Sequence, residues 1–183
     1  MRGFYVGAMI LVGLVHAAGA VGMDEEAPPS PTPTTSICPD GQVWDVDEAE
    51  CVPIAETGLV TDPSSLIGTV RELAYAGRHD DALALLARAP NQDETMVQTY
   101  LGYSLRSMGD MAAGLDHYAR ALALDPDNLL ARSYLGMAHL TRGKPEEAAV
   151  QLAEIRARGG AGRWPERALA AAIAQGATTG YDY

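Results

Sequence analysis

Two cysteines are the residues of this chain best suited to chemistry, because a close pair can either cycle between redox states or form a structural bridge. Cys38 and Cys51 have twelve residues between them. A redox pair favours Cys-x-x-Cys, which keeps both sulfurs near a helix N-terminus, so the longer spacing favours a structural disulfide. Residues 39–41, Pro-Asp-Gly, predict a turn, and residues 43–46 suggest a short strand. The bridge would therefore staple a small hairpin.

The same loop carries four carboxylates that could bind calcium, namely Asp45, Asp47, Glu48 and Glu50. An EF-hand loop places Asp or Asn at alternate positions, followed by Gly and a late Glu. Here Ala49 interrupts the alternation and no Gly follows. We therefore predict no metal site and no cofactor.

The remaining reactive side chains do not form a catalytic set. The sequence has no Gly-x-Ser-x-Gly, no His-Glu-x-x-His, no phosphate-binding glycine loop and no dinucleotide fingerprint. His79, His117 and His139 are expected to be surface or packing residues. A bridge between the cysteines would leave no thiol nucleophile. We therefore predict that the chain is not an enzyme, name no catalytic residue and see no small-molecule substrate.

The first twenty residues have the order of a secretory signal peptide. Arg2 is followed by an apolar run, residues 4–15, and by small residues at Ala18 and Ala20. Cleavage is expected after Ala20, with Gly22 as an alternative. The run is shorter than the roughly 20 residues of a membrane-spanning helix, although an uncleaved anchor would place the chain at a membrane. We expect an exported protein, in a Gram-negative periplasm or else secreted, where two cysteines most simply pair.

The net charge of −11 is concentrated in an acidic arm, residues 21–62, with ten acidic and no basic residues. Residues 63–183 carry fourteen acidic and twelve basic residues, a net charge of −2. This balance excludes nucleic acid as a partner, because phosphates need a basic face. The arm is expected to comprise a disordered, proline-rich acidic linker at 21–36, the disulfide loop at 37–52 and a second linker at 53–62.

From residue 63 onward the sequence repeats with a period of 34. Leu101 and Gly102 match Leu135 and Gly136, and Gly109 matches Gly143. Gly77 precedes Gly109 by 32 residues, and Pro90 accounts for this shorter first unit because proline ends a helix.

These residues resemble the tetratricopeptide repeat, in which each unit pairs two antiparallel helices. That family has Leu-Gly in the first helix, Gly at the turn, Ala and an aromatic residue in the second helix, and Pro near the end. The resemblance implies an all-α helical-hairpin solenoid with units 63–94, 95–128 and 129–162, a capping helix at 163–176 and a tail at 177–183. Three departures are Gly114 in place of Ala, Thr69-Val70 in place of Leu-Gly, and a third unit without the Pro.

In this family the first helices line a concave, partner-binding groove. The resemblance places there Ile67, Arg71, Tyr75, Thr99, Tyr103, Arg106, Ser133, Met137 and Leu140. Such a mixed aromatic and basic surface suits a protein or an extended peptide with apolar and acidic residues, although the arginines could equally be merely solvated.

The resemblance implies a non-enzymatic scaffold or adaptor that binds a peptide or protein in this groove, and the expected export places it in the cell envelope. One alternative is an accessory subunit of an envelope enzyme or redox system that acts through the Cys38–Cys51 loop. Another is a membrane-tethered assembly factor that keeps its signal segment. The acidic arm could fold back into the groove, engage a basic partner, or only keep the protein soluble.

Overall fold

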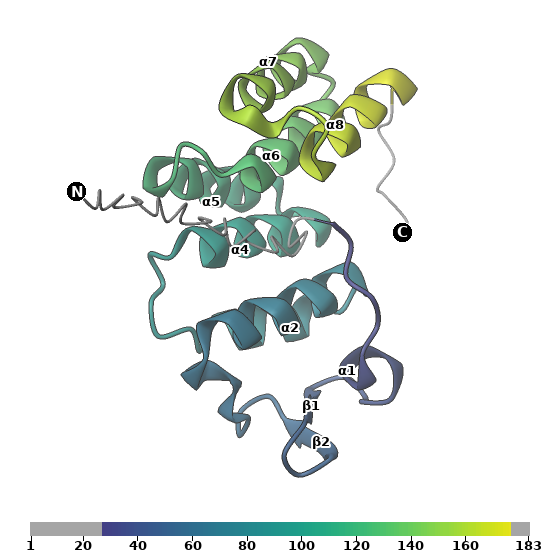
Figure 1. Ribbon diagram of the computed structural model, residues 1–183, viewed down its shortest axis with the longest axis vertical. Coiled ribbons are helices and arrows are strands. Elements are labelled where there is room, and N and C mark those ends of the chain that lie inside the picture. Colours follow the sequence, from purple (N-terminus) through teal and green to yellow (C-terminus); the bar gives the residue numbers. More distant parts are fainter. Residues whose placement is uncertain (1–26, 177–183) are drawn as a thin grey trace, which may run out of the picture.

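The computed structural model describes residues 27–176. The expected signal peptide and the tail at 177–183 lie outside the described residues. The described chain consists of a small N-terminal hairpin followed by a stack of helices (Figure 1). Its elements are α1 (Pro33–Ser36), β1 (Gln42–Asp45), β2 (Glu50–Pro53), the 3-10 helix η1 (Gly58–Thr61), α2 (Pro63–Tyr75), α3 (His79–Leu86), α4 (Thr95–Ser107), α5 (Met111–Leu124), α6 (Leu129–Thr141), α7 (Pro145–Ile155), the π-helical turn η2 (Arg156–Gly160) and α8 (Trp164–Gln175).

Three helical hairpins, α2–α3, α4–α5 and α6–α7, form the solenoid within the described part of the chain. Each hairpin turns at a glycine in the left-handed region, with φ of 77° at Gly77, 99° at Gly109 and 71° at Gly143. These are the turn glycines of the repeat pattern, and only glycine adopts such angles without strain. The expected all-α helical repeat is confirmed.

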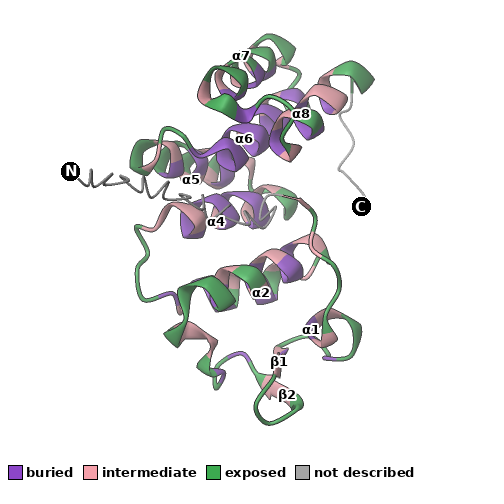
Figure 2. Ribbon diagram, viewed as in Figure 1, coloured by how far each residue is buried: buried purple, intermediate pink, exposed green. Residues whose placement is uncertain are grey.

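A close approach between α4 and α5 explains one departure from the family pattern. A Cβ atom on Gly102 would lie 2.7 Å from the ring of Tyr118, and one on Gly114 would lie 2.9 Å from Cβ of Arg106. Both contacts are shorter than real Cβ contacts, so neither position has room for alanine. Gly114 therefore costs helix propensity but permits this packing. Figure 2 shows the buried residues gathered along α4 and α6, in the middle of the stack.

The helix α8 covers the last hairpin, as a solenoid end requires. A Cβ on Gly136 of α6 would lie 2.6 Å from Cδ2 of Leu169 on α8, and Leu169 is fully buried. The third unit reaches α8 without a proline because Gly159, with φ of 80°, and buried Gly160 form a wide turn. No helix of residues 27–176 is long and apolar enough to span a membrane.

The end of the proline-rich linker differs from its expected disordered chain. Residues 33–36 form a helical turn, because Pro33 occupies the first position and Thr32 caps it by accepting a hydrogen bond from the N–H of Thr34. The disulfide loop then forms an antiparallel hairpin in which Trp44 faces Cys51. Cys38 and Cys51 are bridged, which leaves neither cysteine of the chain free.

Candidate functional site

A cleft of about 510 Å³ opens between α2 and α4. We call it the α2–α4 cleft. It is lined by Pro63, Ser64, Ser65, Ile67, Gly68, Arg71, Glu94, Met96 and Tyr100. Ile67 and Arg71 were predicted to line the groove, and the structure places both in this cleft.

The N-termini of both helices are fixed by carboxylates. Asp62 accepts hydrogen bonds from the N–H groups of Ser64 and Ser65, each at 3.2 Å. Hydrogen bonds from the hydroxyls of Ser65 and then Ser64 lower the pKa of Asp62. Glu94 accepts from the N–H groups of Met96 and Val97 at 3.2 and 3.1 Å. These caps stabilise the first turns that form the cleft walls.

Three tyrosines from the first helices of the three hairpins pack together next to this cleft. The rings of Tyr75 and Tyr103 are stacked, with centroids 5.5 Å apart and planes inclined by 13°. The ring of Tyr134 lies 4.8 Å from that of Tyr103, and the hydroxyls of Tyr75 and Tyr134 are 2.6 Å apart. We call these residues the tyrosine column. Trp164 of α8 lies 6.4 Å from Tyr75 and extends the aromatic contacts to the capping helix.

Burial keeps the hydroxyls of this column neutral. Desolvation raises the pKa of Tyr75, Tyr103 and Tyr134 above the usual value for tyrosine. The column is therefore uncharged at physiological pH, and its hydroxyls act only as hydrogen-bond donors and acceptors. Tyr75 and Tyr103 were both predicted to line the groove; Tyr75 is half-buried, whereas Tyr103 is only 9% exposed and serves mainly in packing.

Arg106 places a positive charge beside the tyrosine column. Its guanidinium carbon lies 5.6 Å from the ring centroid of Tyr103, and its Nε donates to the hydroxyl of Tyr118 at 3.3 Å. Burial raises the pKa of Tyr118 to about 12, so this hydroxyl is a neutral acceptor. Among residues 27–176 no carboxylate forms an ion pair with Arg106, whereas Arg78, Arg132, Arg156 and Arg158 each form at least one. The half-buried Arg106 can therefore still accept an anionic partner.

The other predicted groove residues are corrected by the structure. Thr99 and Ser133 are fully buried, and Met137 and Leu140 are 7% exposed. Thr99 Oγ1 accepts a hydrogen bond from Asn128 at 3.0 Å, and Ser133 Oγ donates to the carbonyl of Pro165 on α8 at 3.0 Å. Thr99 on α4 packs against Asn128 at the start of α6, and Ser133 packs under α8, so these side chains do not line an open surface.

Sequence reasoning missed part of the cleft wall. Met96 and Tyr100 lie on α4 one turn apart and line the cleft. Met96 is also three residues before Thr99, so helical periodicity could have placed it on the predicted groove face. Glu94 could not be assigned in this way, because its side chain lines the cleft only as the cap of α4.

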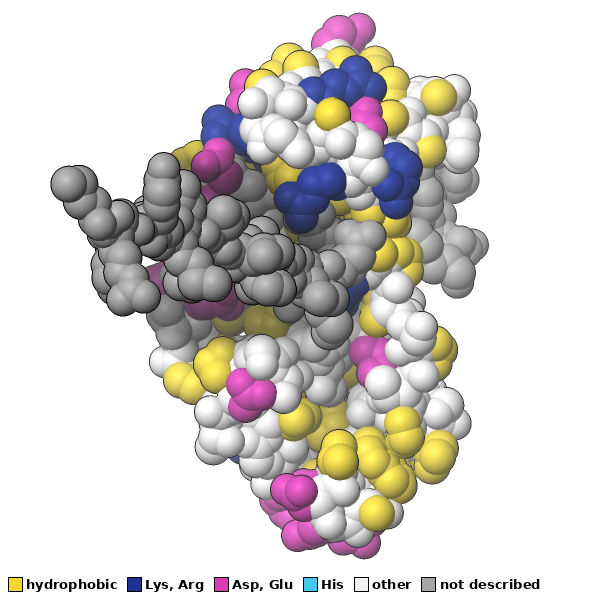
Figure 3. Space-filling view, viewed as in Figure 1, with side chains coloured by type: hydrophobic (Ala, Val, Ile, Leu, Met, Phe, Trp, Pro, Cys, Tyr) yellow, Lys and Arg dark blue, Asp and Glu magenta, His cyan; other side chains and the backbone are white. Residues whose placement is uncertain are grey.

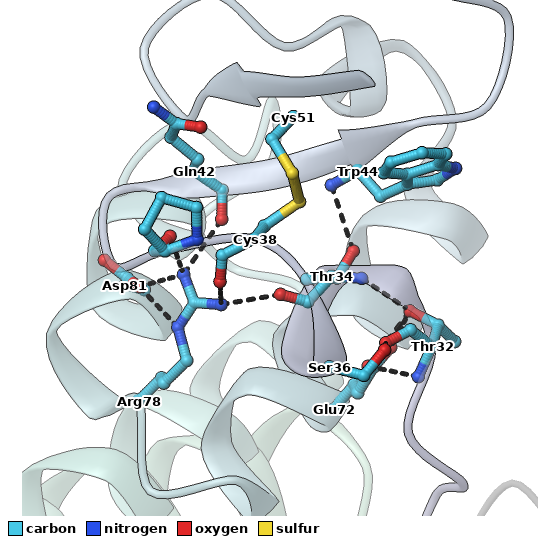
Figure 4. The surroundings of a disulfide bond; sticks show 11 residues. Thr32, Thr34, Ser36, Cys38, Gln42, Trp44, Cys51, Glu72, Arg78 and Asp81 are labelled. Atoms are coloured by element: carbon cyan, nitrogen blue, oxygen red, sulfur yellow. Dashed lines mark hydrogen bonds and ion pairs between the residues drawn. A yellow bond between two sulfur atoms is a disulfide. The ribbon is translucent and has the colours of Figure 1, made fainter. Parts of the chain in front are cut away.

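The described part of the acidic arm does not occupy the cleft but caps the end of the solenoid. Figure 4 shows the main anchor, Arg78, whose guanidinium lies among backbone carbonyls of the arm. It donates to the carbonyls of Thr34 at 2.7 Å, Cys38 at 3.2 Å, Pro39 at 2.9 Å and Gln42 at 2.9 Å. Its Nε also donates to Asp81 Oδ2 at 2.8 Å. A single arginine of the first hairpin thus binds the loop that the disulfide closes.

The carboxylates of the hairpin lie at its exposed tip, at the bottom of the view in Figure 3. Asp45 accepts hydrogen bonds from the N–H groups of Asp47 and Glu48 at 2.9 and 3.0 Å, and so stabilises the turn. Within residues 27–176 no group of three or more His, Cys, Asp or Glu side chains is arranged to hold a metal ion.

Comparison with known families supports the repeat architecture. Residues 105–175 match the family model of the tetratricopeptide repeat. The match runs from the last three residues of α4 through α5, the hairpin α6–α7 and α8. No curated protein and no solved structure matches the chain. Members of the matched family are typically non-catalytic scaffolds that bind proteins or peptides. The resemblance to the tetratricopeptide repeat is thus supported by a family match over residues 105–175.

Proposed function

We propose that the chain is a non-enzymatic adaptor that binds an extended peptide or protein segment in the α2–α4 cleft. The observation that carries this proposal is a cleft of about 510 Å³ on the first-helix face. Its size and its mixture of apolar and polar side chains are typical of a recognition site for a peptide side chain and its flanking backbone.

The location of the cleft restricts binding to the first half of the solenoid. On α6 the predicted groove residues are buried, with Ser133 bonded to α8. The face that remains open to a partner lies between α2 and α4, where Ile67 and Met96 offer apolar contacts and Arg71 offers a basic one. Arg106 adds positive charge farther along α4. A partner segment with an apolar residue followed by acidic residues fits this order of side chains.

We also propose that the adaptor works after export, in the cell envelope. The order of charged, apolar and small residues in residues 1–20 supports export. The Cys38–Cys51 bridge supports an oxidising compartment, because disulfides persist there and are rare in the cytosol. N-terminal sequencing of the mature protein tests this: a first residue of Val21 is expected, whereas an intact Met1 would contradict export with cleavage.

Peptide selection tests the binding function directly. A library of random peptides displayed on phage is selected on the full chain, and the affinities of enriched peptides are measured by fluorescence polarisation. Gly68→Gln is the blocking variant, because Gly68 lines the cleft and a Cβ there meets no atom within 4 Å. The substitution fills the cleft and improves helix propensity, so the fold is retained. We expect it to weaken binding at least tenfold.

Ala119→Gln is the matched control, because Ala119 is exposed on α5, in the middle of a second helix. It adds the same side chain outside the cleft and should leave the affinity unchanged. Peptides that bind both variants as tightly as the native chain would place the binding site elsewhere and overturn the proposal.

A further inference from the structure

We propose that residues 21–26 of the same chain occupy the α2–α4 cleft when no partner is bound, so that a partner must displace them. This inference rests on the proposed function, because it concerns regulation of the same cleft. The segment has the sequence Val-Gly-Met-Asp-Glu-Glu and immediately precedes the described residues. It offers two apolar side chains and three carboxylates, and each kind of group has a counterpart on the first-helix face.

The point where the arm is fixed to α2 determines how far this segment reaches. Glu72 of α2 accepts hydrogen bonds from the N–H of Thr32 at 2.7 Å and from Thr32 Oγ1 at 2.8 Å. Glu26 is six residues before Thr32, a span of at most about 20 Å. Arg71 adjoins Glu72, and α2 has thirteen residues, a length of about 20 Å. Residues 21–26 can therefore reach the whole cleft.

The rest of the arm is held elsewhere, so it does not compete for the cleft. Arg78 fixes the disulfide loop, and Arg88 donates to the carbonyl of Thr57 at 3.2 Å. In Figure 1 the described chain begins at the level of α4 and runs from there to α1, beside the hairpin. Pro28, Pro29 and Pro31 stiffen this connection. This short connection to Thr32 lowers the entropy that residues 21–26 lose on docking in the cleft.

Charge complementarity identifies this segment as the occupant. Asp24, Glu25 and Glu26 are consecutive carboxylates with no basic residue near them in sequence. Arg106 has no carboxylate partner among residues 27–176, and it is half-buried against the ring of Tyr103. A guanidinium shielded from water on one side attracts a carboxylate more strongly than a fully solvated one does. The carboxylates of the segment can form an ion pair with Arg106. Arg71 lines the cleft that the rest of the segment would enter.

The apolar residues of the segment come next along the chain, as the order of the cleft requires. Met23 and Val21 precede the carboxylates, and the wall beyond Arg71 includes Ile67 and Met96. Methionine fills irregular apolar gaps well because it is unbranched and flexible. When the carboxylates of the segment lie at the two arginines, the apolar side chains of Met23 and Val21 therefore fall at the apolar wall of the cleft.

Tethering makes even weak docking effective. A segment on a short connection has an effective concentration in the millimolar range. If the free segment bound with a Kd of about 0.1 mM, the tethered one would reduce the apparent affinity for a competitor about tenfold. A partner of moderate affinity would then be excluded until its local concentration rose.

The test uses a fluorescein-labelled peptide of residues 21–31, added to the full chain and followed by fluorescence polarisation. The native chain is compared with a neutralised chain carrying Asp24→Asn, Glu25→Gln and Glu26→Gln. We expect the neutralised chain to bind the peptide about tenfold more tightly, because its own segment no longer competes. Equal affinities for the two chains would overturn the inference.

Variants of Arg106 in the neutralised chain show whether charge drives the docking. Arg106→Gln should weaken peptide binding at least fivefold, whereas Arg106→Lys, which keeps the charge, should retain most of it. Arg120→Gln, which removes an exposed charge on α5, should have no effect. Raising the salt concentration should weaken binding to the neutralised chain. Binding insensitive to both Arg106→Gln and salt would contradict the pairing.

The selected library peptides separate this inference from the proposed function. If they bind in the cleft, as shown by Gly68→Gln, but bind the native and neutralised chains equally, the function stands and the inference is overturned. If the peptide of residues 21–31 binds the cleft of the neutralised chain and no library peptide does, the inference is supported and partner binding is not.

Discussion

Tyr75 and Tyr134 connect the first and third helical hairpins directly, because their hydroxyl oxygens lie 2.6 Å apart although 59 positions separate them in sequence. In most solenoids each repeat contacts only its neighbours. Here Tyr103 of the second hairpin lies between the two rings and stacks on Tyr75. The first helices of the three hairpins therefore share one aromatic contact.

Removing one hydroxyl of this pair should lower stability. Tyr134→Phe keeps the ring but leaves the Tyr75 hydroxyl without this partner, and we expect a loss of about 1–2 kcal/mol in the free energy of unfolding. The measurement is urea denaturation followed by circular dichroism. Tyr103→Phe is the matched control, because its hydroxyl makes no hydrogen bond within residues 27–176. Equal losses in the two variants would contradict a role for the hydroxyl pair.

The N-terminal cap should depend on the shape of Arg78 and not only on its charge. Arg78→Lys keeps the positive charge, but a single ammonium group cannot reach the carbonyls of Thr34, Cys38, Pro39 and Gln42 together. We expect a loss of about 3 kcal/mol, since hydrogen bonds to a charged group are strong. Urea denaturation measures the loss, and hydrogen exchange of β1 and β2 localises it.

Arg120→Lys is the control for this substitution, since Arg120 is exposed on α5. It should change stability by less than about 0.5 kcal/mol. If Arg78→Lys were equally mild, the guanidinium would not be the anchor of the hairpin.

The helical hairpins could be predicted because their signals are local. Gly77, Gly109 and Gly143 sit at the turns that the period of the sequence indicated, and all three adopt positive φ. The Cys38–Cys51 bridge was also predicted from the spacing of two residues. Such signals need only neighbouring residues, so tertiary packing does not change them.

The groove could not be predicted fully because its exposure depends on distant elements. Ser133 has the expected position on α6, but α8 lies over it. Thr32 and Arg78 are far apart in sequence from the groups they bind, and no local pattern indicated that the arm docks on α2 and α3. Gly114 was noted only as a departure from the family pattern, whereas the structure shows that close packing against α4 requires it.

Stability should fall as the pH drops through the range in which histidine titrates. Burial lowers the pKa values of His79, His117 and His139, and the charge of Arg106 lowers that of His79 further. The unfolded chain therefore takes up protons first as the pH falls below about 6.5, and the free energy of unfolding decreases. Nδ1 of His79 is buried without a hydrogen-bond partner in the described structure, so protonation there has no compensation.

Urea denaturation at pH 7, 6 and 5 measures this dependence, and His79→Gln removes one of the groups responsible. The variant should lose less stability than the native chain over this interval. An identical pH dependence of the two proteins would show that His79 titrates alike in the folded and unfolded chains.

Two glycine substitutions of the same type should have opposite signs. Gly102→Ala places a methyl group 2.7 Å from the ring of Tyr118 and 3.0 Å from the carbonyl of Gly114. The gain in helix propensity cannot offset this overlap, since the Gly114 carbonyl is backbone, and we expect a loss of about 2 kcal/mol. Gly68→Ala meets no atom within 4 Å and should stabilise the chain by about 0.5–1 kcal/mol. Thermal unfolding measures both variants: a neutral Gly102→Ala would refute the close approach of α4 and α5, and a destabilising Gly68→Ala would contradict the open space beside Gly68.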